Sequence, residues 1–89
     1  MDRAVVVALT EGLHARPAAL FVRTAASQPA PARIARPGGA PVDAASILAV
    51  MTLDVAAGEE VVLSTEADGD EAITTLDTLA RFLEQTEPA

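Results

Sequence analysis

The spacing of apolar and polar positions divides the chain into short strands and amphipathic helices. A β-branched run at residues 4–9 predicts a strand that ends at a turn-like Thr-Glu-Gly, and residues 59–65 predict another strand. Over residues 15–27, apolar side chains recur at i, i+3, i+4 and i+7, which predicts an amphipathic helix. The apolar face of this helix is predicted to consist of Ala18, Phe21, Val22 and Ala25.

The remaining elements lie in the middle and at the end of the chain. Residues 33–36 and the residues around Val42 flank a Pro-Gly-Gly-Ala-Pro turn, which predicts a weak hairpin. Ser46 opens an apolar stretch long enough for about two helical turns. A last helix is predicted to start at Asp68, which with Glu71 has the spacing of a capping box. Its apolar face is predicted to consist of Ile73, Leu76, Leu79, Ala80 and Leu83.

The predicted order, β-α-β-β-α-β-α, indicates an α+β fold. Hairpins alternating with helices imply a mostly antiparallel sheet of four strands, covered on one face by the helices as an open-faced two-layer sandwich. The chain has 89 residues, so we expect residues 1–89 to form a single domain.

Composition limits how this fold can be stabilised. Twenty alanines and only two aromatic residues, Phe21 and Phe82, predict a small and thinly filled core. There is no cysteine, so disulfides and thiolate metal sites are excluded. No segment approaches the roughly 20 apolar residues of a membrane span, and the first apolar run is too short for a signal peptide. We therefore expect a cytoplasmic protein with no membrane association.

The charge is unevenly distributed along the chain. Residues 1–41 hold five arginines against Asp2 and Glu11, a charge of +3. Residues 42–89 hold Arg81 against eleven acids, a charge of −10, and the net charge of −7 argues against nucleic acid as a partner. Two interpretations stay open for the basic half: an incidental distribution beside a solvated acidic face, or a surface that meets an acidic partner or a phosphate.

The only histidine, His14, stands where the first helix is predicted to begin. Helix starts normally use Ser, Thr, Asp or Asn, so an imidazole is a poor cap. The N–H groups of Ala15 and Arg16 point back toward this position, which makes it an anion site. Arg16 adds a planar fork suited to phosphate oxygens, and Pro17 lacks an N–H that the first turn does not need. These residues predict that His14 is a nucleophile that caps the helix once it is phosphorylated.

Plainer interpretations of these residues stay open. His14 can be a packing or surface residue, and Arg16 an ordinary surface charge. With one histidine and no cysteine, no metal site or cofactor is expected. A Ser-His-Asp triad lacks the motif that would present its nucleophile.

A partner surface is predicted on the two shorter helices. Leu20 and Arg23 fall opposite the apolar face of the first helix, so Leu20 is expected to be exposed. In the helix opened by Ser46, Val50 and Leu53 can face inward. The outward positions are then Ile47, Leu48 and Met51, unless these three belong to the core. An exposed apolar patch beside a basic rim is typical of a transient docking site.

The segment GLHARPAALFV, residues 12–22, resembles the active-site motif of the HPr family, the phosphocarriers of the bacterial phosphoenolpyruvate:sugar phosphotransferase system. ASILAVMTL, residues 45–53, resembles the second motif of that family. The resemblance implies that His14 accepts a phosphoryl group from enzyme I and passes it to IIA domains of sugar permeases. It also implies that Arg16 steadies the phosphate and that Ser46 is a regulatory serine. In that family the phosphate sits on the ring nitrogen Nδ1, and the sequence does not distinguish the two nitrogens.

Two departures from the family pattern lie near the second motif. Ala45 stands where many members have a basic residue, and Asp54 where many have glycine. Both bear on recognition of Ser46 by a serine kinase and leave the His14 motif intact.

The resemblance favours a monomeric, stoichiometric carrier over an enzyme. The alternative is a regulatory binding module of the same fold, read out through phosphorylation of Ser46 or His14. A serine kinase and a transcription regulator would be its partners. A small phosphohydrolase is disfavoured because the sequence has no evident cluster of general acids or metal ligands.

Overall fold

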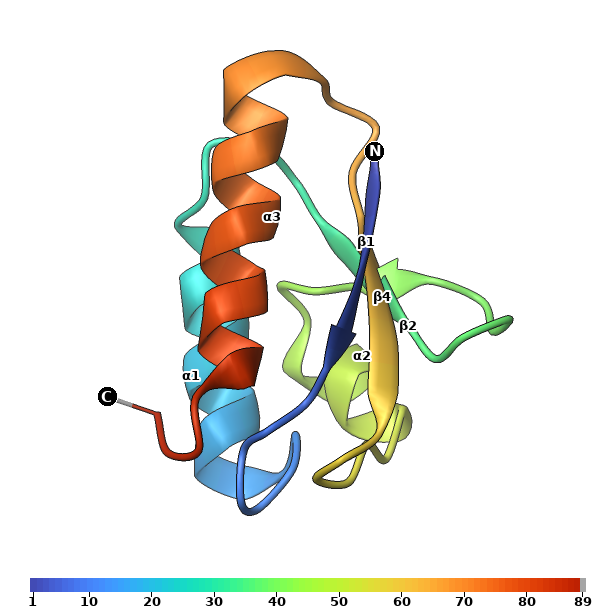
Figure 1. The fold of residues 1–89 in the computed structure, drawn as a ribbon, viewed down its shortest axis with the longest axis vertical. Coiled ribbons are helices and arrows are strands. Elements are labelled where there is room, and N and C mark those ends of the chain that lie inside the picture. The colour runs from blue at the N-terminus through green and yellow to red at the C-terminus, as the bar shows by residue number, and fades with distance from the viewer. Residues whose placement is uncertain (89) are drawn as a thin grey trace.

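Three helices and four strands make up the structure, a computed structural model that describes residues 1–88 (Figure 1). In chain order the elements are β1 (Asp2–Val6), α1 (Ala15–Ala26), β2 (Arg33–Ala35), β3 (Val42–Asp43), α2 (Ile47–Thr52), β4 (Glu60–Ser64) and α3 (Gly69–Glu84). The predicted order of elements, including the hairpin around the Pro/Gly turn and the two-turn helix after Ser46, is confirmed.

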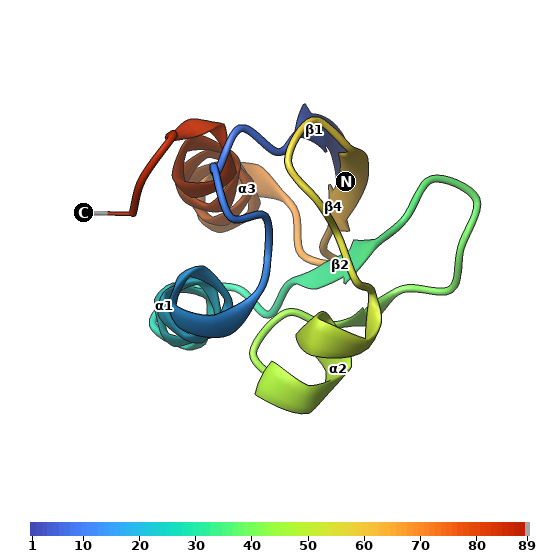
Figure 2. The same ribbon diagram turned by 90° about the horizontal axis from the view of Figure 1, so that it is seen from below.

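The strands form one sheet in the order β1-β4-β2-β3, and every neighbouring pair is antiparallel. Helices α1 and α3 lie side by side against one face of this sheet, and α2 packs beside α1 at the β3 edge (Figure 2). The predicted α+β open-faced sandwich is therefore confirmed.

Strand alternation separates the core face of the sheet from the open face. Val5 pairs with Val61, and both side chains are buried under the helices. The next pair, Val6 and Glu60, points to the open face, where Val6 is 54% exposed. One residue of slip would exchange these faces, so burial of the valines fixes the register.

The first strand differs from its prediction of residues 4–9. Strand β1 starts at Asp2, and its pairing with β4 ends at Val6, where β4 begins with Glu60. Val7 still exchanges backbone hydrogen bonds with Gly58 and Glu59, just before β4, and beyond it the apolar run packs into the core. Val7 and Leu9 are fully buried, and the Ala8 N–H donates to the carbonyl of Leu83 at the end of α3, at 2.8 Å.

Aromatic and alanine side chains join α1 to α3. The rings of Phe21 and Phe82 meet edge to face, with centroids 5.8 Å apart. Ala18 and Ala80 are fully buried in the same cluster, and such small side chains allow helices to approach closely. Val22, which was predicted to lie in the core stripe of α1, is only half-buried at the margin of the core.

Two predictions about α3 are wrong. Ile73 was predicted to face the core but is 54% exposed, while Thr75 is fully buried. The buried hydroxyl of Thr75 accepts a hydrogen bond from the Ala30 N–H at 3.2 Å, so a polar residue is satisfied at the inner position. The capping box is also absent: Asp68 is the N-cap, but its side chain makes no cap hydrogen bond. The acidic groups of Asp70 and Glu71 in the first turn complement the helix dipole instead.

No helix within residues 1–88 combines the length and apolar character that crossing a bilayer requires.

Candidate functional site

His14 is the N-cap residue of α1, as predicted, and its side chain makes no cap hydrogen bond. Its backbone is extended, and its side chain is 39% exposed. Ala15 and Arg16 follow as the first two helical residues, whose N–H groups have no intrahelical acceptor, and Pro17 has no N–H at all. There is no acidic residue in this first turn. The helix start is thus unneutralised and able to receive an anion beside the imidazole.

The backbone is strained next to the histidine. Ala15 has φ of 48°, in the left-handed region that side chains with a Cβ rarely adopt. Such a conformation costs on the order of 1–3 kcal/mol and persists only where the surroundings impose it. It marks the junction at which the chain turns from the loop into α1.

Gly12 holds the loop before His14 against the loop after α2. Its φ is +70°, and a Cβ at this position would lie 2.5 Å from the carbonyl oxygen of Val55. One residue later, the Leu13 N–H donates to that same oxygen at 2.9 Å, and the Leu13 side chain is fully buried. The glycine is therefore required both by the backbone angle and by the close approach of the second loop.

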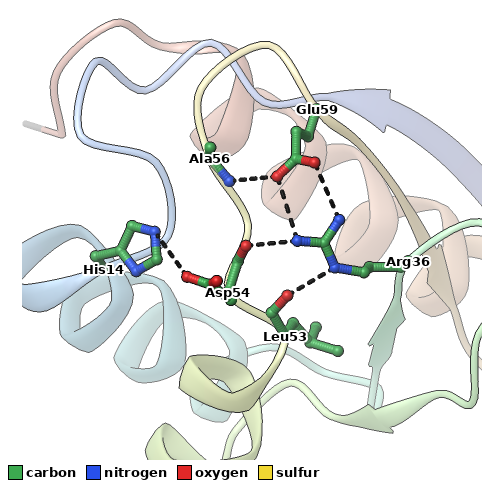
Figure 3. A network of polar contacts seen from close by, with 6 residues as sticks. All are labelled: His14, Arg36, Leu53, Asp54, Ala56 and Glu59. Atoms are coloured by element: carbon green, nitrogen blue, oxygen red, sulfur yellow. Dashed lines mark hydrogen bonds and ion pairs between the residues drawn. The ribbon is translucent and has the colours of Figure 1, made fainter.

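This second loop brings a carboxylate to the histidine. An Asp54 oxygen, Oδ1, lies 3.6 Å from Nε2 of His14, and the Asp54 side chain is 85% exposed (Figure 3). Asp54 has φ of 51°, which explains why glycine suits this position in the HPr family pattern, and aspartate is one of the residues that tolerate it. In the sequence, Asp54 stood out only as a departure from that pattern. The preference for glycine was the available signal that the chain turns there.

A single arginine fixes the loop that carries Asp54. Arg36 Nε donates to the carbonyl of Leu53 at 2.7 Å, and its Nη2 donates to the carbonyl of Asp54 (Figure 3). Its Nη1 also pairs with Glu59 Oε2 at 3.1 Å. The other Glu59 oxygen accepts the N–H of Ala56 at 2.7 Å, so the same carboxylate closes the loop from within.

The charges in this network stabilise one another. The hydrogen bond from Arg36, followed by that from the Ala56 N–H, holds the pKa of Glu59 below its ordinary value. Glu59 in turn raises the pKa of Arg36. Sequence reasoning missed this network, because Arg36 was recognised only as one of several positive charges in the first half of the chain.

Arg16 is exposed and lines a shallow surface cavity with Thr10 and Thr86, among others, near the end of the chain. Within residues 1–88 it makes no ion pair, and the same is true of Arg23 and Arg33. The other two arginines of the basic half are paired inside the fold, Arg3 with Asp77 and Arg36 with Glu59. The basic half therefore presents fewer available cations than its composition indicates.

The helix opened by Ser46 has the predicted cap and faces. The Ser46 hydroxyl accepts the Ala49 N–H at 3.4 Å, and Val50 is fully buried. The outward residues are Ile47, Leu48 and Met51, which are 37%, 76% and 45% exposed.

Two placements limit the predicted partner surface. Leu20, expected to be exposed, is half-buried and packs against the core. Ser46 starts α2, whereas the Asp54 loop that reaches His14 follows the other end of that helix. The structure therefore does not bring Ser46 and His14 together.

Comparison with known proteins yields a consistent group of relatives. A family profile described as "PTS HPr component phosphorylation site" matches residues 1–85. The phosphocarrier protein HPr of Streptomyces coelicolor is 49% identical over 82 residues, which cover 92% of this chain and 86% of that protein.

Solved structures agree with these sequence matches. The crystal structure of HPr from Bacillus anthracis superposes with a TM-score of 0.84 at 36% identity, covering 93% of this chain and 95% of the other. Crh, the catabolite repression HPr of Bacillus subtilis, is similar with a TM-score of 0.71 at 35% identity, covering 96% and 94% of the two chains. That structure is described as a dimer formed by domain swapping.

Proposed function

Because this chain belongs to the HPr family of the phosphotransferase system, we propose that it carries phosphoryl groups on His14 from phospho-enzyme I to IIA domains of sugar permeases. The observation that carries this proposal is the vacant cap of α1. A half-exposed imidazole stands at a helix start that has no acid in its first turn and no side-chain cap. A phosphoryl group on this ring would meet the N–H groups of Ala15 and Arg16 and thereby supply the missing cap.

The transfer needs no other covalent group. The lone pair of an unprotonated ring nitrogen of His14 attacks phosphorus, a nitrogen–phosphorus bond forms, and the bond to the donor breaks. In the second half of the cycle the acceptor attacks phosphorus, and the electron pair returns to the ring. Arg16, which makes no ion pair within residues 1–88, can place its guanidinium on the phosphate oxygens. The phosphorylated protein is the product of its reaction with the donor and the substrate of its reaction with the acceptor, which makes it a stoichiometric carrier.

The partners would dock beside this site. Ile47, Leu48 and Met51 form an apolar patch, and Arg23 and the half-buried Leu20 lie on the neighbouring helix α1. Contact between an apolar centre and a polar or charged rim is typical of transient complexes. We place these encounters in the cytoplasm and expect residues 1–89 to act as one unit and as a monomer.

A regulatory role is the second candidate, supported by the similarity to Crh. Ser46 is the residue available for it, since it is a half-exposed residue whose hydroxyl caps α2 beside the apolar patch. A phosphate there would be tolerated by the helix start but would place negative charge at the docking surface. In this role a serine kinase would phosphorylate Ser46, and the protein would bind a transcription regulator.

Incubation with enzyme I and labelled phosphoenolpyruvate tests the leading proposal. The label should appear on this protein, be lost in acid and survive base, as a phosphoramidate does and a phosphoserine does not. His14→Ala should abolish labelling, while Ser46→Ala, the matched control, should retain it. Label that persists in His14→Ala would refute the carrier function of His14.

A further inference from the structure

We infer that Asp54 is a positioning residue for phosphoryl transfer, because its carboxylate holds a proton on Nε2 of His14 and leaves Nδ1 as the nucleophile. The inference rests on the proposed function of His14. It follows from the 3.6 Å contact between Asp54 Oδ1 and Nε2, which is ion-pair distance. The negative charge of a carboxylate at this distance favours the form of the ring in which the facing nitrogen carries hydrogen. The other nitrogen, Nδ1, then holds the lone pair.

The backbone that carries Asp54 is fixed in place. Arg36 holds the carbonyls of both Leu53 and Asp54, and Glu59 anchors Arg36 in turn. On the other side, the hydrogen bond from Leu13 to the Val55 carbonyl ties the loop to the residue that precedes His14. The backbone of the Asp54 loop and that of the residue before His14 are thus held from two directions, whereas the Asp54 side chain itself is exposed (Figure 3).

The placement of the proton bears directly on transfer. When Nδ1 attacks phosphorus, the donor leaves with its bonding pair, and the ring becomes a phosphoimidazolium with hydrogen still on Nε2. Its positive charge then faces the Asp54 carboxylate. When the acceptor attacks, the Nδ1–P bond breaks, its electron pair returns to Nδ1, and a neutral imidazole leaves. If Nε2 lost its hydrogen, the leaving group would be an imidazolate, which departs far less readily. Asp54 therefore keeps the phosphoryl group labile.

The charged surroundings of the ring are few. Asp54 is the charged side chain within ion-pair distance of His14 among residues 1–88. Arg16 lies two residues further along the chain, at the start of α1, where its guanidinium can contact the phosphate oxygens. Arg36 and Glu59 pair with each other behind the loop. Asp54 is thus the charged group placed to act on Nε2.

The test uses phosphoramidate, a small phosphoryl donor that works without enzyme I. Wild type, Asp54→Asn and Asp54→Gly are phosphorylated with it, and loss of the phosphohistidine signal is followed by ³¹P NMR. Both substitutions suit the backbone of residue 54, since Gly and Asn accept a positive φ. Asp68→Asn is the matched control, because Asp68 is also exposed and its side chain makes no cap hydrogen bond.

At about pH 8 the two Asp54 variants should lose phosphate roughly twofold to fivefold more slowly than wild type, the range given by exposed ion pairs. At about pH 5, which lies below the ordinary pKa of an imidazole and above that of an aspartate, the rates should converge. Asp68→Asn should follow wild type at both values, and the phosphate of wild type should sit on Nδ1.

Equal rates at about pH 8 would overturn the inference. A gap that persists at about pH 5 would also overturn it, because the carboxylate would then act by repelling the phosphate rather than by holding a proton. Phosphate found on Nε2 of the wild-type protein would also overturn the inference. A protein that behaves as expected here but takes no label from enzyme I would refute the proposed function and leave the role of Asp54 standing.

Discussion

Substitution of Gly12 by alanine is the sharpest test of how the two loops build the site. Gly12 has φ of +70°, and an added Cβ would lie 2.5 Å from the Val55 oxygen and 3.0 Å from the Ala56 Cα. Both are backbone atoms that cannot swing aside as a side-chain terminus would. One of the two loops must therefore move, and the hydrogen bond from Leu13 to Val55, 2.9 Å in length, lies directly in the path of that movement.

The expected loss of stability has two parts. An alanine in the left-handed region costs about 1–2 kcal/mol, and loss of one hydrogen bond costs about 0.5–1.5 kcal/mol. Together they predict that Gly12→Ala lowers the free energy of unfolding by roughly 1.5–3.5 kcal/mol. Gly58→Ala is the matched control, since Gly58 has φ of +87° but nothing within 4 Å of its would-be Cβ. Gly58→Ala should therefore show only the backbone cost of about 1–2 kcal/mol.

Urea unfolding of the two variants measures these losses, and labelling by enzyme I and phosphoenolpyruvate measures the site. Gly12→Ala should lose more stability than Gly58→Ala and should also accept phosphate more slowly, because His14 is displaced from Asp54. Gly58→Ala should be labelled at the rate of wild type. If both variants lost the same stability and were labelled equally, the contact between the loops would not be what positions His14.

Three further predictions concern single side chains. Arg16→Ala should slow phosphoryl transfer in stopped-flow measurements. Because Arg16 is exposed, the substitution should change the free energy of unfolding in urea by no more than about 0.5 kcal/mol. An unchanged transfer rate would show that Arg16 is not part of the site. Ser46→Asp should leave the melting temperature unchanged. In calorimetric titration it should weaken enzyme I binding at least about tenfold, or roughly 1.4 kcal/mol. Equal affinities would mean that Ser46 is only a helix cap. For Glu59, whose pKa is lowered by Arg36, the stabilisation is present above its ordinary pKa and is lost as the pH falls through the lowered value. The stability gap between wild type and Glu59→Gln should thus be largest near neutrality and shrink below about pH 4 in urea unfolding, whereas a constant gap would contradict the pairing.

Local patterns determined most of the element order. The periodicity of α1, the Pro/Gly turn of the hairpin and the cap at Ser46 each depend on residues within a few positions of one another. His14 could likewise be placed at a helix start, because the mismatch between an imidazole and an N-cap is visible without any tertiary contact. The family motif carried the rest of the functional hypothesis.

Only packing decided which side of an element faced inward when the sequence offered two choices. Thr75 rather than Ile73 is buried because the Ala30 N–H, 45 residues away in the chain, needs an acceptor there. Leu20 is half-buried because it packs against the core at the margin of α1, a helix that contacts both α2 and α3. Neither neighbour can be inferred from periodicity, which describes a helix alone.

The same limit applies to the site. His14 and Asp54 are brought within 3.6 Å only after Gly12 has allowed two loops to touch and Arg36 has fixed the second loop. These contacts join three separate stretches of the chain, and each depends on the sheet order that sets those stretches side by side. Sequence determines which groups are present and how each short segment folds. The distances between groups on different segments are fixed by packing of the whole core, because burial of apolar surface there offsets the conformational entropy lost when the loops are ordered.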